Sequence, residues 1–134
     1  MNNIFVDPKE KITVTVVIGQ QNNKIVSAVN EEELKKNYKD IDLGTVESHQ
    51  ITFRRPNYKD NVDILRMTMT TDGDEIKVDA ATLRYERFVR LLQSWTFKNG
   101  ENIIPANRDN INKLEFVIAN TIMDSLDNAL GSSM

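Results

Sequence analysis

The sequence is poor in the residues from which catalytic, metal and redox sites are usually built. It contains no cysteine and a single histidine, His49. The absence of cysteine excludes disulfide bonds and thiolate metal sites. A Ser/His/Asp triad or a histidine-based metal site would have to form around His49, and no nucleophile motif or carboxylate spacing accompanies it. We therefore predict no catalytic residue, no cofactor and no metal, in a protein that is not an enzyme.

Glycine and long apolar runs are also scarce. The chain has only 5 glycines and neither a GxGxxG nor a GxxxxGK[ST] motif, so a cradle for nucleotide phosphates is disfavoured. Residues 72–75 (DGDE) lack the alternating acids and the distal glutamate of a calcium loop, and we interpret them as a turn. No stretch approaches the roughly 18 apolar residues of a membrane span, and residues 1–11 do not resemble a signal peptide. We expect a cytoplasmic setting without a membrane partner.

The remaining composition is that of an ordinary globular protein. The 134 residues are 40% hydrophobic and 28% charged, which suits a single domain with one core. The net charge of −3 gives no general attraction to nucleic acid. We predict an α+β fold, with a small N-terminal antiparallel sheet packed against about three C-terminal helices. Residues 1–56 are expected to be mainly β, residues 57–130 mainly α, and residues 131–134 a flexible tail.

The sheet is predicted from three extended segments. Residues 12–18 (ITVTVVI) are all β-branched, with Ile12, Val14, Val16 and Ile18 on one face. Turn-forming residues follow, and residues 24–29 resume an extended pattern, so the two segments predict a hairpin. Residues 46–53 (VESHQITF) predict a third strand that ends before Pro56.

A short helix is predicted between the hairpin and the third strand. Asn30 is followed three residues later by Glu33, the spacing of a capping box. Acidic residues lie in the first turn and lysines near the end, which suits the helix dipole. Residues 40–45 are expected to form a loop.

The period of the apolar residues changes to that of helices after Asn57, which we predict to be an N-cap. The stripe of this first helix is Tyr58, Val62, Leu65 and Met69, and the polar residues 70–74 are expected to end it. Asp79 is the predicted cap of a second helix that continues to Trp95.

A loop is expected at residues 97–106, followed by a last helix that ends near Gly131. Its stripe comprises Ile111, Leu114, Ile118, Ile122 and Leu126. Across the helical half, the predicted core anchors are Phe88, Leu92, Trp95, Ile118 and Ile122.

Two sets of side chains in the helical half are candidate contacts with another protein. Arg84, Arg87 and Arg90 recur every third residue on the second helix, either as a basic surface or as an internally paired face. Arg84 lies within the apolar sector of that helix, where it must extend to solvent or meet an acid. The apolar residues outside the main helix stripes contact either a partner or a second side of the core. They are Ile64, Met67, Phe116 and Met123.

The order of features along residues 51–130 has a family resemblance. Residues 51–60 (ITFRRPNYKD) predict a strand that ends in an arginine-proline step and leads into a helix with an early aromatic and acidic residue. Further along, a helix ends at a tryptophan and is followed by a turn glycine, an isoleucine-proline step, an asparagine cap and a closing helix. These places are held by Trp95, Gly100, Ile104, Pro105 and Asn107. The pattern resembles tailed-bacteriophage tail assembly chaperones and related small tail or baseplate proteins.

The resemblance implies a non-enzymatic protein without a cofactor that binds other phage tail proteins, such as tape-measure, tube or baseplate subunits. It would act in the host cytoplasm during viral tail assembly, as a chaperone or as a structural subunit retained in the virion. A homo-oligomer is left open, and no individual residue receives a role from the family. The alternative function is that of a nucleic-acid-associated accessory or regulatory protein that uses the arginine-lined helix.

Overall fold

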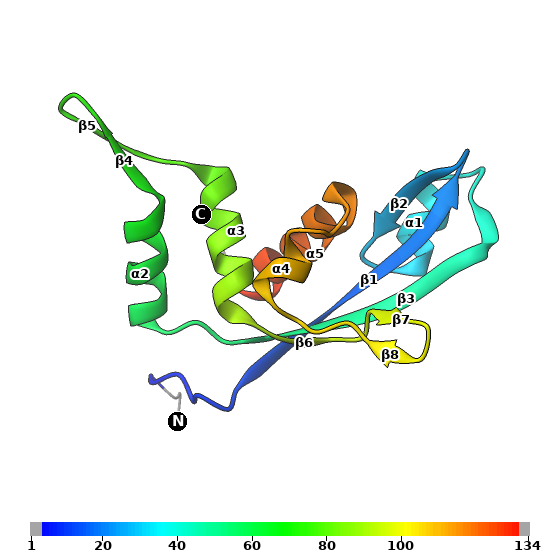
Figure 1. Ribbon diagram of the computed structural model, residues 1–134, viewed down its shortest axis with the longest axis horizontal. Coiled ribbons are helices and arrows are strands. Elements are labelled where there is room, and N and C mark those ends of the chain that lie inside the picture. Colours follow the sequence, from blue (N-terminus) through cyan, green and yellow to red (C-terminus); the bar gives the residue numbers. More distant parts are fainter. Residues whose placement is uncertain (1–3, 132–134) are drawn as a thin grey trace.

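The α+β class predicted from the sequence is confirmed by the computed structural model, which describes residues 4–131. A four-stranded antiparallel sheet has the order β2-β1-β3-β6, and helices of the C-terminal half cover it (Figure 1). Its strands are β1 (Lys11–Gln21), β2 (Lys24–Ala28), β3 (Asp42–Arg54) and β6 (Leu92–Trp95). Of the predicted tail, Gly131 is described, and residues 132–134 lie outside the described residues.

The N-terminal hairpin forms as predicted because its turn accepts a left-handed backbone. Asn22 and Asn23 join β1 to β2 and have φ values of 54° and 64°. Asparagine tolerates this region better than most residues, and two such residues in succession match the twist of a hairpin. The third strand is longer than expected, since β3 begins at Asp42, inside the predicted loop.

The two faces of β1 pack against different layers. Val14 and Val16 lie in the main core with Ile51 and Phe53 of β3, on the face predicted from the alternation. Val17 points to the other face, where it packs with Leu34 of α1 (Glu31–Asn37). Helix α1 begins at the predicted cap, because the Asn30 side chain accepts a hydrogen bond from the Glu33 backbone N–H.

The main core lies between the sheet and the helices α3 (Ala80–Leu91) and α5 (Phe116–Ala129). Four of the predicted core anchors are buried in it, namely Phe88, Trp95, Ile118 and Ile122. Leu92, the fifth, is partly buried and packs against the same cluster. The hydroxyls of Ser27 on β2 and Thr121 on α5 are hydrogen-bonded at 2.6 Å, which fixes this helix on the strand.

The predicted helix from Asp79 to Trp95 is wrong at its C-terminal end. Asp79 does cap α3, but the helix ends at Leu91 and the next four residues form β6. Pairing with β6 satisfies backbone groups of β3 that would otherwise stand on an open edge. Trp95 lies opposite Ile51, and its indole N–H donates a hydrogen bond to the Ile104 carbonyl at 2.5 Å.

Two segments expected to be loops contain short hairpins, because each has a glycine at the turn. The polar stretch after the first helix folds into β4 (Met69–Asp72) and β5 (Glu75–Val78), with Gly73 at a φ of 66°. The segment after Trp95 forms β7 (Lys98–Asn99) and β8 (Asn102–Ile103) around Gly100, which has a φ of 68°. The predicted last helix is divided into two helices, α4 (Arg108–Ile111) and α5.

Helix α2 (Tyr58–Thr68) presents a different face to the protein from the predicted one. Asn57 caps it as expected, yet the buried residues are Asp60, Ile64 and Thr68. Tyr58, at the start of the predicted stripe, is 79% exposed. The predicted stripe does not face the core because Asp60 is held by arginines from β3 and α3, which turns the Asp60 side of the helix inward.

Candidate functional site

The arginine stripe of α3 is directed at acidic residues rather than at solvent. Arg84 forms ion pairs with Asp124 and Asp127 of α5, so it meets acidic partners, one of the two outcomes expected. Arg87 is buried and also pairs with Asp127, at 2.7 Å. These two arginines attach α3 to α5, so of the two alternatives for their spacing, the internally paired face is the one observed.

The third arginine, Arg90, joins a cluster around Asp60. The Asp60 carboxylate accepts two hydrogen bonds from Arg54 on β3, at 2.5 and 2.7 Å, and one from Arg90, at 2.9 Å. It also accepts from the Asn57 backbone N–H at 2.9 Å, which completes a capping box for α2. Asp60 is therefore the point at which β3, α2 and α3 are joined.

The charge of Asp60 makes the stability of the protein sensitive to acid. The hydrogen bonds from Arg54 hold the pKa of Asp60 well below its usual range, against the opposing effect of burial, and those from Asn57 and Arg90 add to this. Because the folded-state pKa is lowered, the stabilisation is complete above the ordinary carboxyl pKa of about 4 and is lost as the pH falls below it.

We therefore expect urea denaturation midpoints to be flat between neutral pH and about pH 5 and to fall steeply below about pH 4. The Asp60→Asn variant should start lower and lose less on acidification. Midpoints that fall in parallel for both proteins would show that other carboxyls cause the acid sensitivity.

The apolar contact candidates divide into two groups. Ile64 and Met123 are only 2% and 3% exposed, so they are corrected from contact residues to packing residues, as is Arg87 among the charged candidates. Ile64 was misassigned because α2 is rotated by the Asp60 cluster, and Met123 because the core covers more than one side of α5. Met67 and Phe116 are 58% and 75% exposed and remain available for contact.

An exposed apolar surface belongs to the β4–β5 hairpin, which we call the arm (residues 69–78). The arm connects α2 to α3 and projects beyond both helices (Figure 1). Every residue of its two strands is exposed. An isolated two-stranded hairpin is marginally stable in water, so a projecting one gains from a partner.

The pairing of the arm gives it one apolar and one polar face. Met69 pairs with Val78 and Thr71 pairs with Ile76, and paired residues in register lie on the same face. Ile76 is 66% exposed, while Met69 and Val78 are 45% and 47% exposed. The opposite face carries Thr70, Asp72, Glu75 and Lys77. Sequence inspection missed this amphipathic element because each strand is too short for its alternation to be recognised.

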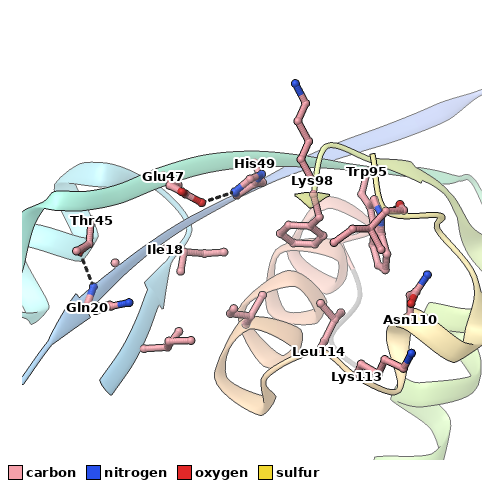
Figure 2. A pocket seen from close by; sticks show the side chains of 15 residues that line it. Ile18, Gln20, Thr45, Glu47, His49, Trp95, Lys98, Asn110, Lys113 and Leu114 are labelled. Carbon is pink, nitrogen blue, oxygen red and sulfur yellow. Dashed lines mark hydrogen bonds and ion pairs between the residues drawn. The ribbon is translucent and has the colours of Figure 1, made fainter. Parts of the chain in front are cut away.

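A pocket of about 440 Å³ lies between the sheet and the N-terminal end of α5, and we call it the sheet pocket. Its size falls within the range of about 300 to 1,000 Å³ that is usual for ligand sites. Figure 2 shows Ile18 and Leu114 inside it, with Trp95 at one side. Lys98 and Lys113 stand at its margins. These residues are far apart in the sequence, which is why only the fold brings them together.

His49 lines the sheet pocket but is engaged by its neighbours. Its Nε2 atom lies 3.1 Å from a Glu47 carboxylate oxygen, and its Nδ1 atom lies 3.4 Å from the Thr96 hydroxyl (Figure 2 shows the first contact). The ring centroid is 4.8 Å from that of Phe97. The imidazole thus packs into the pocket wall and has no serine or cysteine nucleophile among these contacts.

A second hollow, of about 610 Å³, runs between α3 and the start of α5. Phe88, Ile111, Phe116 and Met123 contribute apolar lining, and Arg84 and Tyr85 contribute polar atoms. Arg84 is already paired with acids of α5, so the charge beside this hollow is compensated within the chain.

Within residues 4–131, no group of three or more histidine or acidic side chains is placed to hold a metal ion. None of the helices in that range is long and apolar enough to cross a membrane. Comparison of the chain with protein-family models, with curated proteins and with solved structures gives no match.

Proposed function

We propose that this chain is a non-enzymatic protein of bacteriophage tail morphogenesis that binds other proteins through its arm. It acts as a tail assembly chaperone or as a tail or baseplate subunit of the virion, and its partners are tape-measure, tube or baseplate proteins. The viral assignment is supported by the resemblance over residues 51–130. The contact itself is supported by one observation, the projecting apolar face of Met69, Ile76 and Val78.

An exposed apolar face of this kind is unfavourable unless something covers it. Contiguous apolar patches on soluble proteins mark contact sites, whereas single exposed apolar residues do not. Met67, in the last turn of α2 just before the arm, is also exposed. Methionine side chains adapt to irregular partner surfaces, which suits a protein that meets several partners.

The nucleic-acid alternative has less support. It depended on Arg84, Arg87 and Arg90 as a free basic stripe, and each of these guanidinium groups is engaged by an aspartate. Contacts with DNA or RNA would require arginine side chains that are free to bind the phosphates of the nucleic-acid backbone. Because these arginines are paired within the chain, the protein-contact function of the arm is better supported than nucleic-acid binding.

The test is co-purification of the tagged chain with tape-measure, tube and baseplate proteins of the same virus. We expect Ile76→Asp to reduce the recovered partner at least about tenfold, because it places an unpaired charge in an apolar contact. Thr70→Asp is the matched control, since it adds the same charge on the opposite face, facing Lys77. Equal recovery with both variants, or no tail protein bound to the unmodified chain, would contradict the proposal.

Mass spectrometry of mature particles then separates the two roles. A defined copy number in the particles makes the chain a virion subunit, and its presence only with unassembled tail proteins makes it a chaperone.

A further inference from the structure

We infer that the arm of one copy of this chain seats in the sheet pocket of a second copy, so that the protein associates with itself from head to tail. This inference rests on the proposed function, because it names a partner of the same arm. It is carried by three features of the described residues: matching apolar surfaces, opposite charges and the placement of the two elements.

The arm and the sheet pocket match in polarity. The arm offers three aliphatic or thioether side chains on one face, with Ile76 the most exposed at 66%. The pocket offers apolar surface from Ile18, Leu114 and Ile118, closed at one side by Trp95. Burial of a projecting aliphatic side chain in such a pocket is the usual arrangement at the centre of a protein contact.

Their charges are opposite. The end of the arm carries Asp72, Asp74 and Glu75, while Lys98 and Lys113 stand at the pocket margins. Among residues 4–131, the structure gives Asp74, Glu75 and the two lysine side chains no ion pair within the chain. The pocket also holds the carboxylate of Glu47, 3.1 Å from His49 Nε2, so its lining carries two lysines against one acid. An arm entering the pocket therefore brings unpaired acids to unpaired lysines, which favours encounter and register.

The two elements are too far apart to meet within one copy. Along the longest axis of the molecule, the arm projects at one end, and α2 and α3 separate it from the β7–β8 segment and the β1–β2 hairpin that border the pocket (Figure 1). A contact between two different surfaces of identical chains is heterologous, so it continues from copy to copy into a ring or an open chain.

The competing arrangement pairs one arm with another arm. This symmetric contact would also cover the apolar face, but it leaves Lys98 and Lys113 without a role and brings together arms that each carry three acids near the turn. The second hollow is a less suitable receptor, since its arginine is compensated by acids of α5. Both alternatives become outcomes of the test.

The test is light scattering with size-exclusion chromatography over a concentration series of the full chain. We expect self-association of the unmodified protein, and a dissociation constant at least about thirtyfold larger for Ile76→Asp, the effect of losing a central apolar anchor. The double variant Lys98→Glu, Lys113→Glu should also be monomeric, and both lysines are exposed, so it keeps its fold. Thr70→Asp should associate like the unmodified chain.

Mixing the two monomeric variants gives the decisive result. The double lysine variant has an intact arm and the Ile76→Asp variant has an intact pocket, so an equimolar mixture should form dimers and nothing larger. A lysine variant that associates by itself as well as the unmodified chain would favour the arm-to-arm contact or the second hollow and would overturn the inference. So would a mixture that stays monomeric.

Disulfide trapping provides a check that does not depend on charge reversal. The natural chain has no cysteine, so with Ile76→Cys in one copy and Lys113→Cys in another, every linked heterodimer contains the intended bond, and linked homodimers are told apart by a mass tag on one variant. We expect an oxidised mixture to give more than about tenfold more linked heterodimer than a mixture in which Thr70→Cys replaces Ile76→Cys. Equal yields would overturn the inference.

Failure of this inference is distinguishable from failure of the proposed function. If Ile76→Asp leaves self-association unchanged but abolishes co-purification with tail proteins, the arm binds a different partner and the proposed function stands. If Ile76→Asp changes neither measurement, the arm is not a contact element and both are wrong.

Discussion

Replacement of Asp60 with alanine is expected to lower the free energy of unfolding by about 3 to 5 kcal/mol, the cost of removing one member of a buried ion pair. Asp60 is 3% exposed and is the shared acceptor of Arg54 and Arg90. Without it, the partly buried Arg54 loses two hydrogen bonds and Arg90 keeps the one to Asp63, and α2 loses the acidic half of its capping box. A domain of this size has only about 5 to 15 kcal/mol in total, so the loss is large.

We expect the midpoint of thermal unfolding, monitored by circular dichroism, to fall by roughly 10 to 20 °C. Asp63→Asn is the matched control, because Asp63 also pairs with Arg90 but is more exposed and does not cap the helix. Hydrogen exchange should accelerate most in residues 57–78, since Asp60 holds α2 and the arm to the rest of the chain. A melting temperature within a few degrees of the unmodified protein would show that Asp60 is not the central link.

Replacement of Trp95 with alanine should cost a similar amount, about 3 to 5 kcal/mol, for a different reason. Trp95 is 4% exposed, pairs with Ile51 in the sheet, and contacts the edge of Phe97 at a centroid distance of 5.1 Å. Its removal leaves a cavity between β6 and the loop that carries Ile104, and the Ile104 carbonyl loses its donor.

The control for Trp95 is phenylalanine, which keeps an aromatic ring but not the indole N–H. Trp95→Phe should be destabilised by much less than Trp95→Ala, while the loss of the hydrogen bond alone accounts for about 1 kcal/mol. The free energy of unfolding of both variants is measured by urea denaturation monitored by circular dichroism. Tryptophan fluorescence is not usable, because the protein has a single tryptophan and both variants lack it. A urea midpoint for Trp95→Ala equal to that of the unmodified protein would contradict the assignment of Trp95 as a core anchor.

The local elements were predicted well where a residue acts on its immediate neighbours. The caps at Asn30, Asn57 and Asp79 are in place because an N-cap depends on a side chain and a backbone N–H only two or three residues apart. The inward face of β1 was also correct, since a run of β-branched residues alternates regularly between two faces.

The errors arose where a distant segment competed with local preference. Helix α3 ends at Leu91 because the next residues pair with the open edge of β3. The sequence of residues 79–95 alone does not indicate that this edge exists. Helix α2 hides Ile64 and exposes Tyr58 because two arginines from other elements hold Asp60. In α3, contacts across the fold outweigh a helical preference that is worth only a few tenths of a kcal/mol per residue. In α2 the helix itself forms as predicted, and the distant arginines decide only which face is buried.

The sequence by itself determined the α+β class, the first hairpin, the starts of α1, α2 and α3 and the side chains that anchor the core, because periodicity and capping are encoded within a few residues. Only the tertiary structure decided that the arginine stripe is internally paired, that residues 69–78 project as an arm with an apolar face, and that β1, β3, β6 and α5 enclose a pocket. The projection of the arm depends on the placement of α2 and α3, which it joins. The arginine pairs and the pocket depend on the separation and orientation of elements that are far apart along the chain. Pair energies at such sequence separations are set by the packing of the whole domain, so local pattern alone does not specify them.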